Sequence, residues 1–184
     1  MKLPKAKGIW PSFWMLWENI EKVGWPKCGE IDLVESINED DIVINNLHWF
    51  DDGTKDRDDY VSENKVTNKD EFHIYELLWE EDYIRIYIDG KQTYIIDIEH
   101  IATNAFTKQF YLILNIAVGG DFPGDDIDDS KFPLELVVDY IEVYQKKYNY
   151  KYNPKILVYE LALEFKPWTL VPKKISFIKM EFFI

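Results

Sequence analysis

The sequence predicts an all-β sandwich built as one domain. Short runs of β-branched and aromatic residues recur along the chain, and turn residues separate them. Helical periodicity is sparse. The chain has 184 residues, of which 47% are hydrophobic and 16% aromatic, so it offers the apolar surface that one core of ordinary size requires.

The first predicted strand spans residues 9–17, where side chains alternate between two faces. Pro11 interrupts this apolar stretch and no small-residue cleavage site follows it, so we interpret it as a strand and not as the core of a signal peptide. Its faces carry Trp10, Ser12 and Trp14 on one side and Pro11, Phe13 and Met15 on the other.

A hairpin over residues 84–96 is the strongest local prediction. Residues 84–88 and 92–96 are β-rich runs, and Asp89 and Gly90 between them suit a type I′ turn. Residues 110–117 predict a further strand. The last predicted strand covers residues 136–144, with Val137, Asp139, Ile141 and Val143 on one face and Val138, Tyr140, Glu142 and Tyr144 on the other.

The charge of the protein restricts its partners. With 34 acidic and 21 basic residues, the net charge is -13. A protein that neutralises phosphates needs a basic surface, so nucleic acid and anionic membrane surfaces are excluded, whereas neutral ligands and cations remain. No apolar run reaches the roughly 20 residues of a membrane-spanning helix. The sequence carries no signal for the oligomeric state.

Cysteine and histidine usage excludes the common metal motifs. Cys28 is the single cysteine, so the chain has neither an intramolecular disulfide nor a Cys-rich zinc site. The three histidines, His48, His73 and His100, are scattered and lack paired metal-ligand spacing.

The composition changes sharply near residue 149. Residues 149–184 carry six Lys and three acidic residues, a net charge of +3, whereas residues 1–148 carry 15 basic and 31 acidic residues, a net charge of -16. Residues 156–165 and 175–184 predict an extra hairpin, edge strands or a short helix, and Pro167 and Pro172 keep such segments short and separate.

Three carboxylates mark the candidate chemistry. In a strand, residues i and i+2 share a face, so Glu30 and Asp32 point the same way while Glu35 has the opposite parity. One β-bulge between Asp32 and Glu35 would bring all three carboxylates onto one face, and bulges are common beside active sites.

Paired carboxyls suit a retaining glycoside hydrolase, in which one serves as nucleophile and the other as general acid and then base. Asp32 between Glu30 and Glu35 would hold a proton or a hydrogen bond that orients the nucleophile. Three acids at one fixed spacing arise by chance about once in a chain this acidic, so the spacing alone is weak evidence for catalysis.

Aromatic side chains surround the acidic strand. Flat indole faces stack on neutral sugars, and His48 is a candidate ligand for a sugar hydroxyl. Each of these residues has a structural alternative as a member of the core. The tryptophans concerned are Trp10, Trp14, Trp25 and Trp49.

Ordered blocks of the chain carry a family resemblance. They are residues 8–16 (GIWPSFWML), 25–35 (WPKCGEIDLVE), 72–90, 112–124 (LILNIAVGGDFPG) and 138–145. These blocks resemble the laminarinase-like members of glycoside hydrolase family 16, which are secreted endo-β-1,3-glucanases. The resemblance implies a concanavalin-like jelly-roll β-sandwich with a concave cleft for glucan, and an extracellular location.

The resemblance also implies roles for residues. Glu30 falls on the nucleophile of the family, Asp32 on its helper and Glu35 on the acid/base, and the Glu-x-Asp-x-x-Glu spacing accompanies laminarinases. Val34 replaces a Met common in laminarinases, which affects packing more than chemistry. Implied substrate-binding residues are Trp25, which falls on a sugar-stacking position, and Trp10, Trp14, His48, Trp49 and Asn115.

The resemblance divides the chain into two parts. Residues 1–148 correspond to a partial catalytic domain that begins after several N-terminal strands of the family, so open ladder edges and self-association are expected. Residues 149–184 form a tail without counterpart. Catalysis in the family needs no cofactor, but members often bind one structural Ca²⁺, with a ligand at the position of Asp139.

Four functions therefore compete. The first is a retaining endo-glycosidase that hydrolyses internal β-1,3 or mixed β-1,3-1,4 bonds in glucans such as laminarin. The others are a carbohydrate-binding sandwich without turnover, a cation-binding acidic module and an inactive fragment. A binder would keep the Trp faces but would not need Glu30, Asp32 and Glu35 together, so we favour the enzyme. The acidic run of residues 121–129 lacks the EF-hand pattern and is interpreted as a solvated loop.

Overall fold

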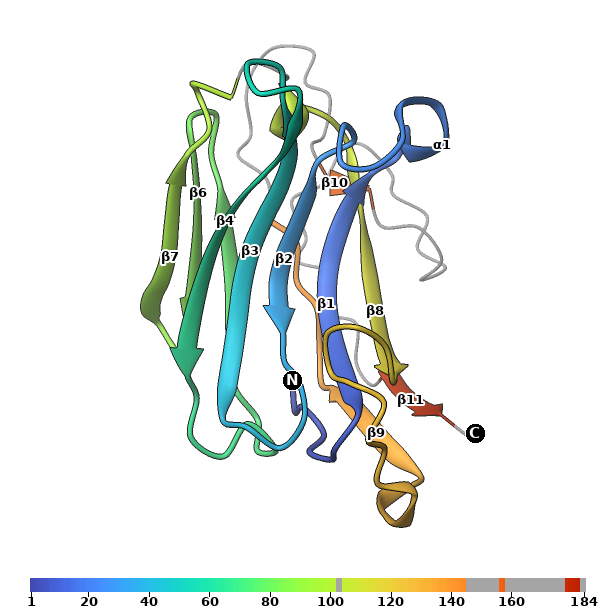
Figure 1. The fold of residues 1–184 in the computed structure, drawn as a ribbon. Helices are drawn as coiled ribbons and strands as arrows, with labels where there is room; N and C mark the ends of the chain where they lie inside the picture. The colour runs from blue at the N-terminus through green and yellow to red at the C-terminus, as the bar shows by residue number, and fades with distance from the viewer. Residues whose placement is uncertain (102–103, 145–155, 158–177, 183–184) are drawn as a thin grey trace.

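A six-stranded sheet forms one layer of the protein (Figure 1). The computed structural model describes residues 1–101, 104–144, 156–157 and 178–182. Neighbouring strands of the sheet follow the order β10-β8-β1-β2-β3-β4. Their bounds are β1 Ile9–Trp17, β2 Glu30–Glu35, β3 Ile42–Asp51, β4 Asp56–Lys65, β8 Phe110–Val118 and β10 Ile156–Leu157.

A three-stranded antiparallel sheet of order β5-β6-β7 packs behind the β2–β4 side of the larger sheet (Figure 1). Its strands are β5 Tyr75–Trp79, β6 Tyr83–Ile88 and β7 Lys91–Asp97. Strands β9 Leu134–Val138 and β11 Ile178–Phe182 form a separate antiparallel pair. The short helices are α1 Ile20–Val23, η1 Ala105–Thr107 and η2 Asp129–Lys131.

The core lies between the two larger sheets. Ile31 and Leu47 of the six-stranded sheet and Ile84 and Ile86 of the three-stranded sheet are fully buried members of one hydrophobic cluster. Side chains alternate along strands, so Glu30, Asp32 and His48 lie on the opposite face of their sheet from Ile31 and Leu47. The predicted all-β sandwich is confirmed, and its outer face is where the acids lie.

The structure confirms the predicted hairpin but not the bounds of the predicted strand over residues 136–144. Asp89 and Gly90 have φ angles of 50° and 74°, which are the two positive values of the predicted type I′ turn between β6 and β7. The predicted strand over residues 136–144 is wrong in its bounds. Strand β9 ends at Val138, because among the described residues the ladder with β11 stops where Val138 pairs with Ile178.

The tail contributes two described strands to the fold. Strand β10 pairs in parallel with β8 at its start, and β11 pairs antiparallel with β9. The two tail strands therefore lie in different sheets and do not pair with each other as the hairpin alternative required. The remaining parts of the predicted segments 156–165 and 175–184 lie outside the described residues.

Helices play little part in the described fold. Within residues 1–101 and 104–144 the structure contains one α-helix, α1, which is four residues long. No helix in the part of the chain that the structure describes is long and apolar enough to cross a membrane.

Candidate active site

Strand β2 contains the predicted β-bulge. Asp32 pairs with Asn46 of β3 and Glu35 pairs with Ile44, so two residues of β2 lie opposite one residue of β3. The ladder with β1 shifts at the same place. The extra residue restores the parity of the strand, so Glu30, Asp32 and Glu35 share one face. The spacing argument is confirmed in its geometry.

The three carboxyls are buried to different degrees. Asp32 is 1% exposed and Glu35 is 8% exposed, whereas the side chain of Glu30 retains 15% exposure. Burial disfavours a charged carboxylate, and neighbouring negative charges disfavour it further. Three acids in so small a space therefore cannot all be ionised near neutral pH.

The three carboxyls differ in pKa because each has different neighbours. Burial, followed by the charge of Glu30, raises the pKa of Glu35 to about 7. Burial raises the pKa of Asp32 well above its usual value, and the charges of Glu35 and Glu30 add to the shift. Burial also raises the pKa of Glu30, but hydrogen bonds with Trp25 and Asp32 and the positive charge of Arg57 oppose the shift. The arrangement favours a protonated Asp32 that donates to an ionised Glu30.

Each glutamate accepts a hydrogen bond from an indole. Trp25 Nε1 donates to Glu30 Oε2 at 2.9 Å, and Trp10 Nε1 donates to Glu35 Oε1 at 3.0 Å. Donation to the charged form of a carboxyl lowers its pKa. These two tryptophans therefore orient the acids, a role beyond the sugar stacking that the sequence predicts.

Trp14 and Asn115 form a pair of their own. Trp14 Nε1 donates to Asn115 Oδ1 at 2.7 Å across the ladder between β1 and β8. The two predicted substrate-binding residues are brought together on the strand pair next to β2. Their contact with substrate stays a prediction.

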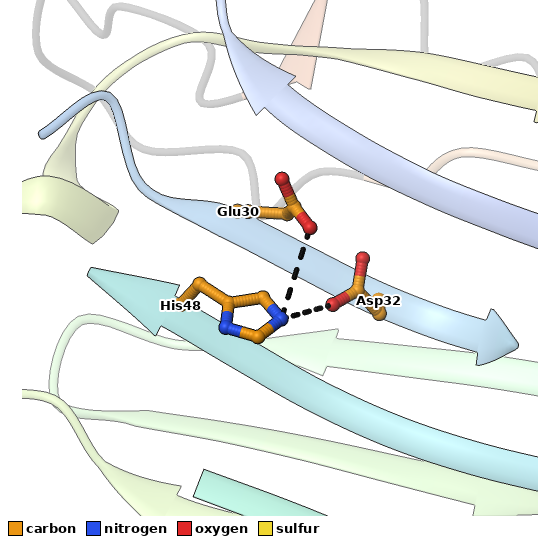
Figure 2. Close-up of side chains that lie close together, drawn as sticks. All are labelled: Glu30, Asp32 and His48. Atoms are coloured by element: carbon orange, nitrogen blue, oxygen red, sulfur yellow. Dashed lines mark ion pairs between the residues drawn. The ribbon is translucent and has the colours of Figure 1, made fainter. Parts of the chain in front are cut away.

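His48 lies beside Glu30 and Asp32 (Figure 2). Its Nε2 is 3.4 Å from Asp32 Oδ2 and 3.9 Å from Glu30 Oε1. Burial lowers the pKa of His48; the charge of Asp59 counteracts this shift and that of Arg57 adds to it. The ring also contacts Trp25 at a centroid distance of 5.8 Å. The histidine thus faces the acids.

Three residues of this site are absent from the sequence predictions. Asn46 Nδ2 lies 3.0 Å from His48 Nε2, Asp59 Oδ2 lies 3.9 Å from His48 Nδ1, and Arg57 pairs with Asp59 at 3.2 Å. The i, i+2 parity that groups Glu30 with Asp32 also groups Asn46 with His48, so that signal was available. Arg57 and Asp59 lie on β4, and only the register of β3 with β4 places them here.

Trp49 lies apart from the carboxyls. Its ring packs edge-on against Phe106 at a centroid distance of 6.1 Å and contributes to the rim of the hydrophobic core. It also lines a surface cavity of about 210 Å³ with Phe50, Asp51, Asp58, His100 and Ile101. Its predicted substrate contact stays a prediction, at a place separate from Glu30 and Glu35.

The predicted calcium ligand has few companions. Among the described residues, Asp139 belongs to no group of three or more carboxylate, His or Cys ligands close enough to share an ion. Calcium takes six to eight oxygen ligands. The structural Ca²⁺ at Asp139 stays a prediction, and no step of the chemistry involves one.

Two glutamates and an intervening aspartate on a bulged strand of a β-sandwich form the arrangement that the family resemblance implies. The family can be stated from comparison with known proteins. The model of family 16 of the glycosyl hydrolases matches residues 1–142, and the chain belongs to this family.

Several relatives share most of this chain. It is 34% identical to the clotting factor G alpha subunit of Tachypleus tridentatus and 33% identical to glucan endo-1,3-beta-glucosidase A1 of Niallia circulans, with 79% of this chain covered in each comparison. The laminarinase of Flavobacterium sp. UMI-01 is 37% identical with a TM-score of 0.62 over 72% of this chain. The chain spans 22%, 23% and 58% of the lengths of these three proteins.

Proposed function

We propose that this chain carries the catalytic centre of a retaining endo-glycosidase that hydrolyses internal β-1,3 or mixed β-1,3-1,4 bonds in glucans, on the segment of residues 1–148. The observation that carries the proposal is the bulge that aligns Glu30 and Glu35 around Asp32. The glucan specificity is supported by the glucan endo-1,3-beta-glucosidase and the laminarinase that the chain resembles.

In the first step the acid and the nucleophile act together. Glu35 donates its proton to the glycosidic oxygen while the Glu30 carboxylate attacks the anomeric carbon from the opposite side. The glycosidic bond breaks, the leaving sugar departs with the proton, and the remaining sugar is esterified to Glu30. Asp32 donates a hydrogen bond to Glu30 and keeps the attacking oxygen oriented.

In the second step water displaces Glu30 from the anomeric carbon of the bound sugar. The Glu35 carboxylate removes a proton from a water molecule, whose oxygen attacks the anomeric carbon and displaces Glu30. Two inversions give a product with the original anomeric configuration. A pKa of about 7 for Glu35 suits this exchange of roles, because the residue is protonated at the start and ionised afterwards.

The surroundings of the acids suit a neutral polysaccharide. Trp25 is 47% exposed and adjoins Glu30, so its ring offers a face on which a sugar stacks. The acidic character of the chain, with its net charge of -13, repels anionic polysaccharides. We place the protein outside the cell, where such glucans occur, with the glucan as its partner.

Hydrolysis of laminarin tests this proposal. The protein is expected to cut laminarin at internal bonds and so to release reducing ends along the glucan. Proton NMR of the first product is expected to show the β anomer before mutarotation. The matched control is Glu30→Gln, which keeps the shape of the side chain. Binding of laminarin without release of reducing sugar by the unmodified protein would instead support the carbohydrate-binding alternative.

A further inference from the structure

We infer that Glu30, Asp32 and His48 form a binding site for a divalent transition-metal ion such as Zn²⁺, and that the bound ion blocks the nucleophile. The three ligand atoms come from neighbouring strands β2 and β3 and lie within 4.8 Å of one another (Figure 2). Binding of the ion is independent of the proposed function. The inhibition that follows from it rests on the assignment of Glu30 as nucleophile.

The distances fit a tetrahedral ion. Zinc bonds of 2.0–2.2 Å to nitrogen and oxygen place neighbouring ligand atoms about 3.4 Å apart. His48 Nε2 and Asp32 Oδ2 are separated by 3.4 Å, and Glu30 Oε1 lies 3.9 Å from the same nitrogen. A small rotation of the Glu30 carboxyl, whose side chain is 15% exposed, therefore completes a face of three ligands.

An unpartnered atom points into the site. Asp32 is 1% exposed and its Oδ2 has no hydrogen-bond partner. A buried polar atom without a partner is costly, and an ion at this position would satisfy it. The ion takes the place of the proton that Asp32 holds in the metal-free site, and that proton is released to water. One imidazole and two carboxylates then suit Zn²⁺ or Cu²⁺, whereas Ca²⁺ takes six to eight oxygens.

A second layer of contacts orients the ligands. Trp25 Nε1 holds Glu30 Oε2, which leaves Oε1 directed to the ion. The Nδ1 atom of His48 has no hydrogen-bond partner and faces Asp59 Oδ2 at 3.9 Å. At 3.9 Å the two atoms are too far apart for a hydrogen bond, and their approach on metal binding would give the carboxylate–histidine–metal arrangement that fixes the ring.

Asn46 is the group that must adjust. Its Nδ2 lies 3.0 Å from His48 Nε2, where the ion would bond, and its Oδ1 is buried without a partner. Rotation of the amide by half a turn directs Oδ1 towards the same place, where it serves as a fourth ligand. Arg57 is a positive charge close to His48, but its guanidinium pairs with Asp59 at 3.2 Å.

Zinc titration of the whole protein by calorimetry tests the inference. We expect one Zn²⁺ per chain, and His48→Gln to weaken binding at least about tenfold. The matched controls are His73→Gln and His100→Gln, which remove the other two histidines of the chain. His100 lies in the second cluster of metal-capable ligands in the described residues, with Asp97 and Glu99, and is a stringent control.

A measurement on the unmodified site covers the case in which His48→Gln does not fold. In proton NMR, the ring resonance of His48, assigned with the two control variants, is expected to shift or broaden on addition of Zn²⁺ while those of His73 and His100 stay in place. Hydrolysis of laminarin is expected to stop as the site fills and to return on chelation. Unchanged His48 resonances, or zinc affinity lost in His100→Gln instead, would overturn the inference even if the protein proves to be a glucanase.

Discussion

The two ends of strand β2 hold the same chemical group in different surroundings. Glu30 and Glu35 each accept one indole N–H, from Trp25 and Trp10. Burial raises the pKa of both glutamates. At the Glu30 end a hydrogen bond with Asp32 and the positive charge of Arg57 oppose that shift, whereas at the Glu35 end the negative charge of Glu30 adds to it. Both glutamates accept a hydrogen bond from tryptophan, so the contacts that differ separate their pKa values and underlie the proposed roles of nucleophile and acid.

The two ends of β2 also differ in the contacts that hold them in place. Beyond Glu35, Ser36 accepts a hydrogen bond at 2.8 Å from the ammonium of Lys69, which is completely buried. Asn38 then ties this end to the start of β1 through Gly8 N–H and to Pro123 O. The Glu30 end has the half-exposed Trp25 as its neighbour. The Glu35 end is therefore held in the interior while the Glu30 end faces solvent.

Replacing the glutamates should have the largest effect and should separate the two ends. Glu30→Gln is expected to lower kcat at least about 10⁴-fold, because the nucleophile is lost. Glu35→Gln is expected to cost about 10²- to 10⁴-fold on laminarin. Azide should rescue Glu35→Gln on an activated glycoside and give a glycosyl azide of retained configuration, since that variant lacks only the base for water.

The folded state of both variants can be checked by thermal melting, which should resemble that of the unmodified protein. Unchanged hydrolysis in both variants would remove the basis of the assignment. A retained azide product from Glu30→Gln in place of Glu35→Gln would reverse the roles of the two ends.

The support of the Glu35 end can be broken at Lys69. Its ammonium donates to Ser36 Oγ and to the carbonyls of Asn38 and Ile37. Lys69→Met keeps the length of the side chain but leaves these buried acceptors unpaired, while it removes a charge whose burial lowers the pKa of Lys69 to about 8. We expect a net loss of about 2 kcal/mol in the free energy of unfolding, measured by urea denaturation.

The matched control for Lys69→Met is Lys5→Met. Lys5 pairs with Asp41 and Asp70 at 2.6 and 3.1 Å near the surface. Exposed ion pairs of this kind contribute about 0–1 kcal/mol. Equal losses in the two variants would show that burial of Lys69 has no special part in stabilising the Glu35 end.

The indole at the Glu35 end can be tested by pH. Trp10→Phe keeps the ring but removes the N–H that favours ionised Glu35, so the pKa of Glu35 should rise above its value of about 7. Because Glu35 must be protonated in the first step, the basic limb of the kcat/KM profile should move up by about one pH unit. Trp14→Phe, whose N–H serves Asn115, should leave that limb in place. A basic limb that stays put in Trp10→Phe would contradict this account.

The smallest effect on folding is expected at Trp25. Trp25→Ala should raise KM for laminarin by about 2- to 13-fold, which corresponds to about 0.5–1.5 kcal/mol of lost stacking. Loss of the N–H that Trp25 donates to Glu30 should lower kcat as well. Its ring is 47% exposed, so the loss in folding free energy should stay below about 1 kcal/mol in a thermal melt. A fall of roughly 3–5 kcal/mol, typical of a core tryptophan, would show that the Glu30 end depends on Trp25 for packing.

Local sequence patterns predicted the strands that show apolar alternation or have clear turn residues beside them. The strand over residues 9–17, the type I′ hairpin at Asp89 and Gly90 and the strand over residues 110–117 all recur in the structure as β1, β6–β7 and β8. Strand β4 was missed because its residues are polar and exposed, with no apolar alternation to indicate a strand. The end of β9 was misplaced because alternation continues in the sequence beyond the point where described ladder partners stop.

The parity of the site follows from the spacing of its three acids along the strand. Because side chains alternate along a strand, the spacing of Glu30, Asp32 and Glu35 requires one bulge, and that bulge exists. Which side chains accept the N–H groups of Trp10 and Trp14 depends on the tertiary structure, since Trp10 is 25 residues from Glu35 and Trp14 is 101 residues from Asn115. The tertiary structure also decided the proton affinities, because burial and the register that brings Arg57 and Asp59 of β4 beside His48 depend on contacts between strands that no local pattern encodes.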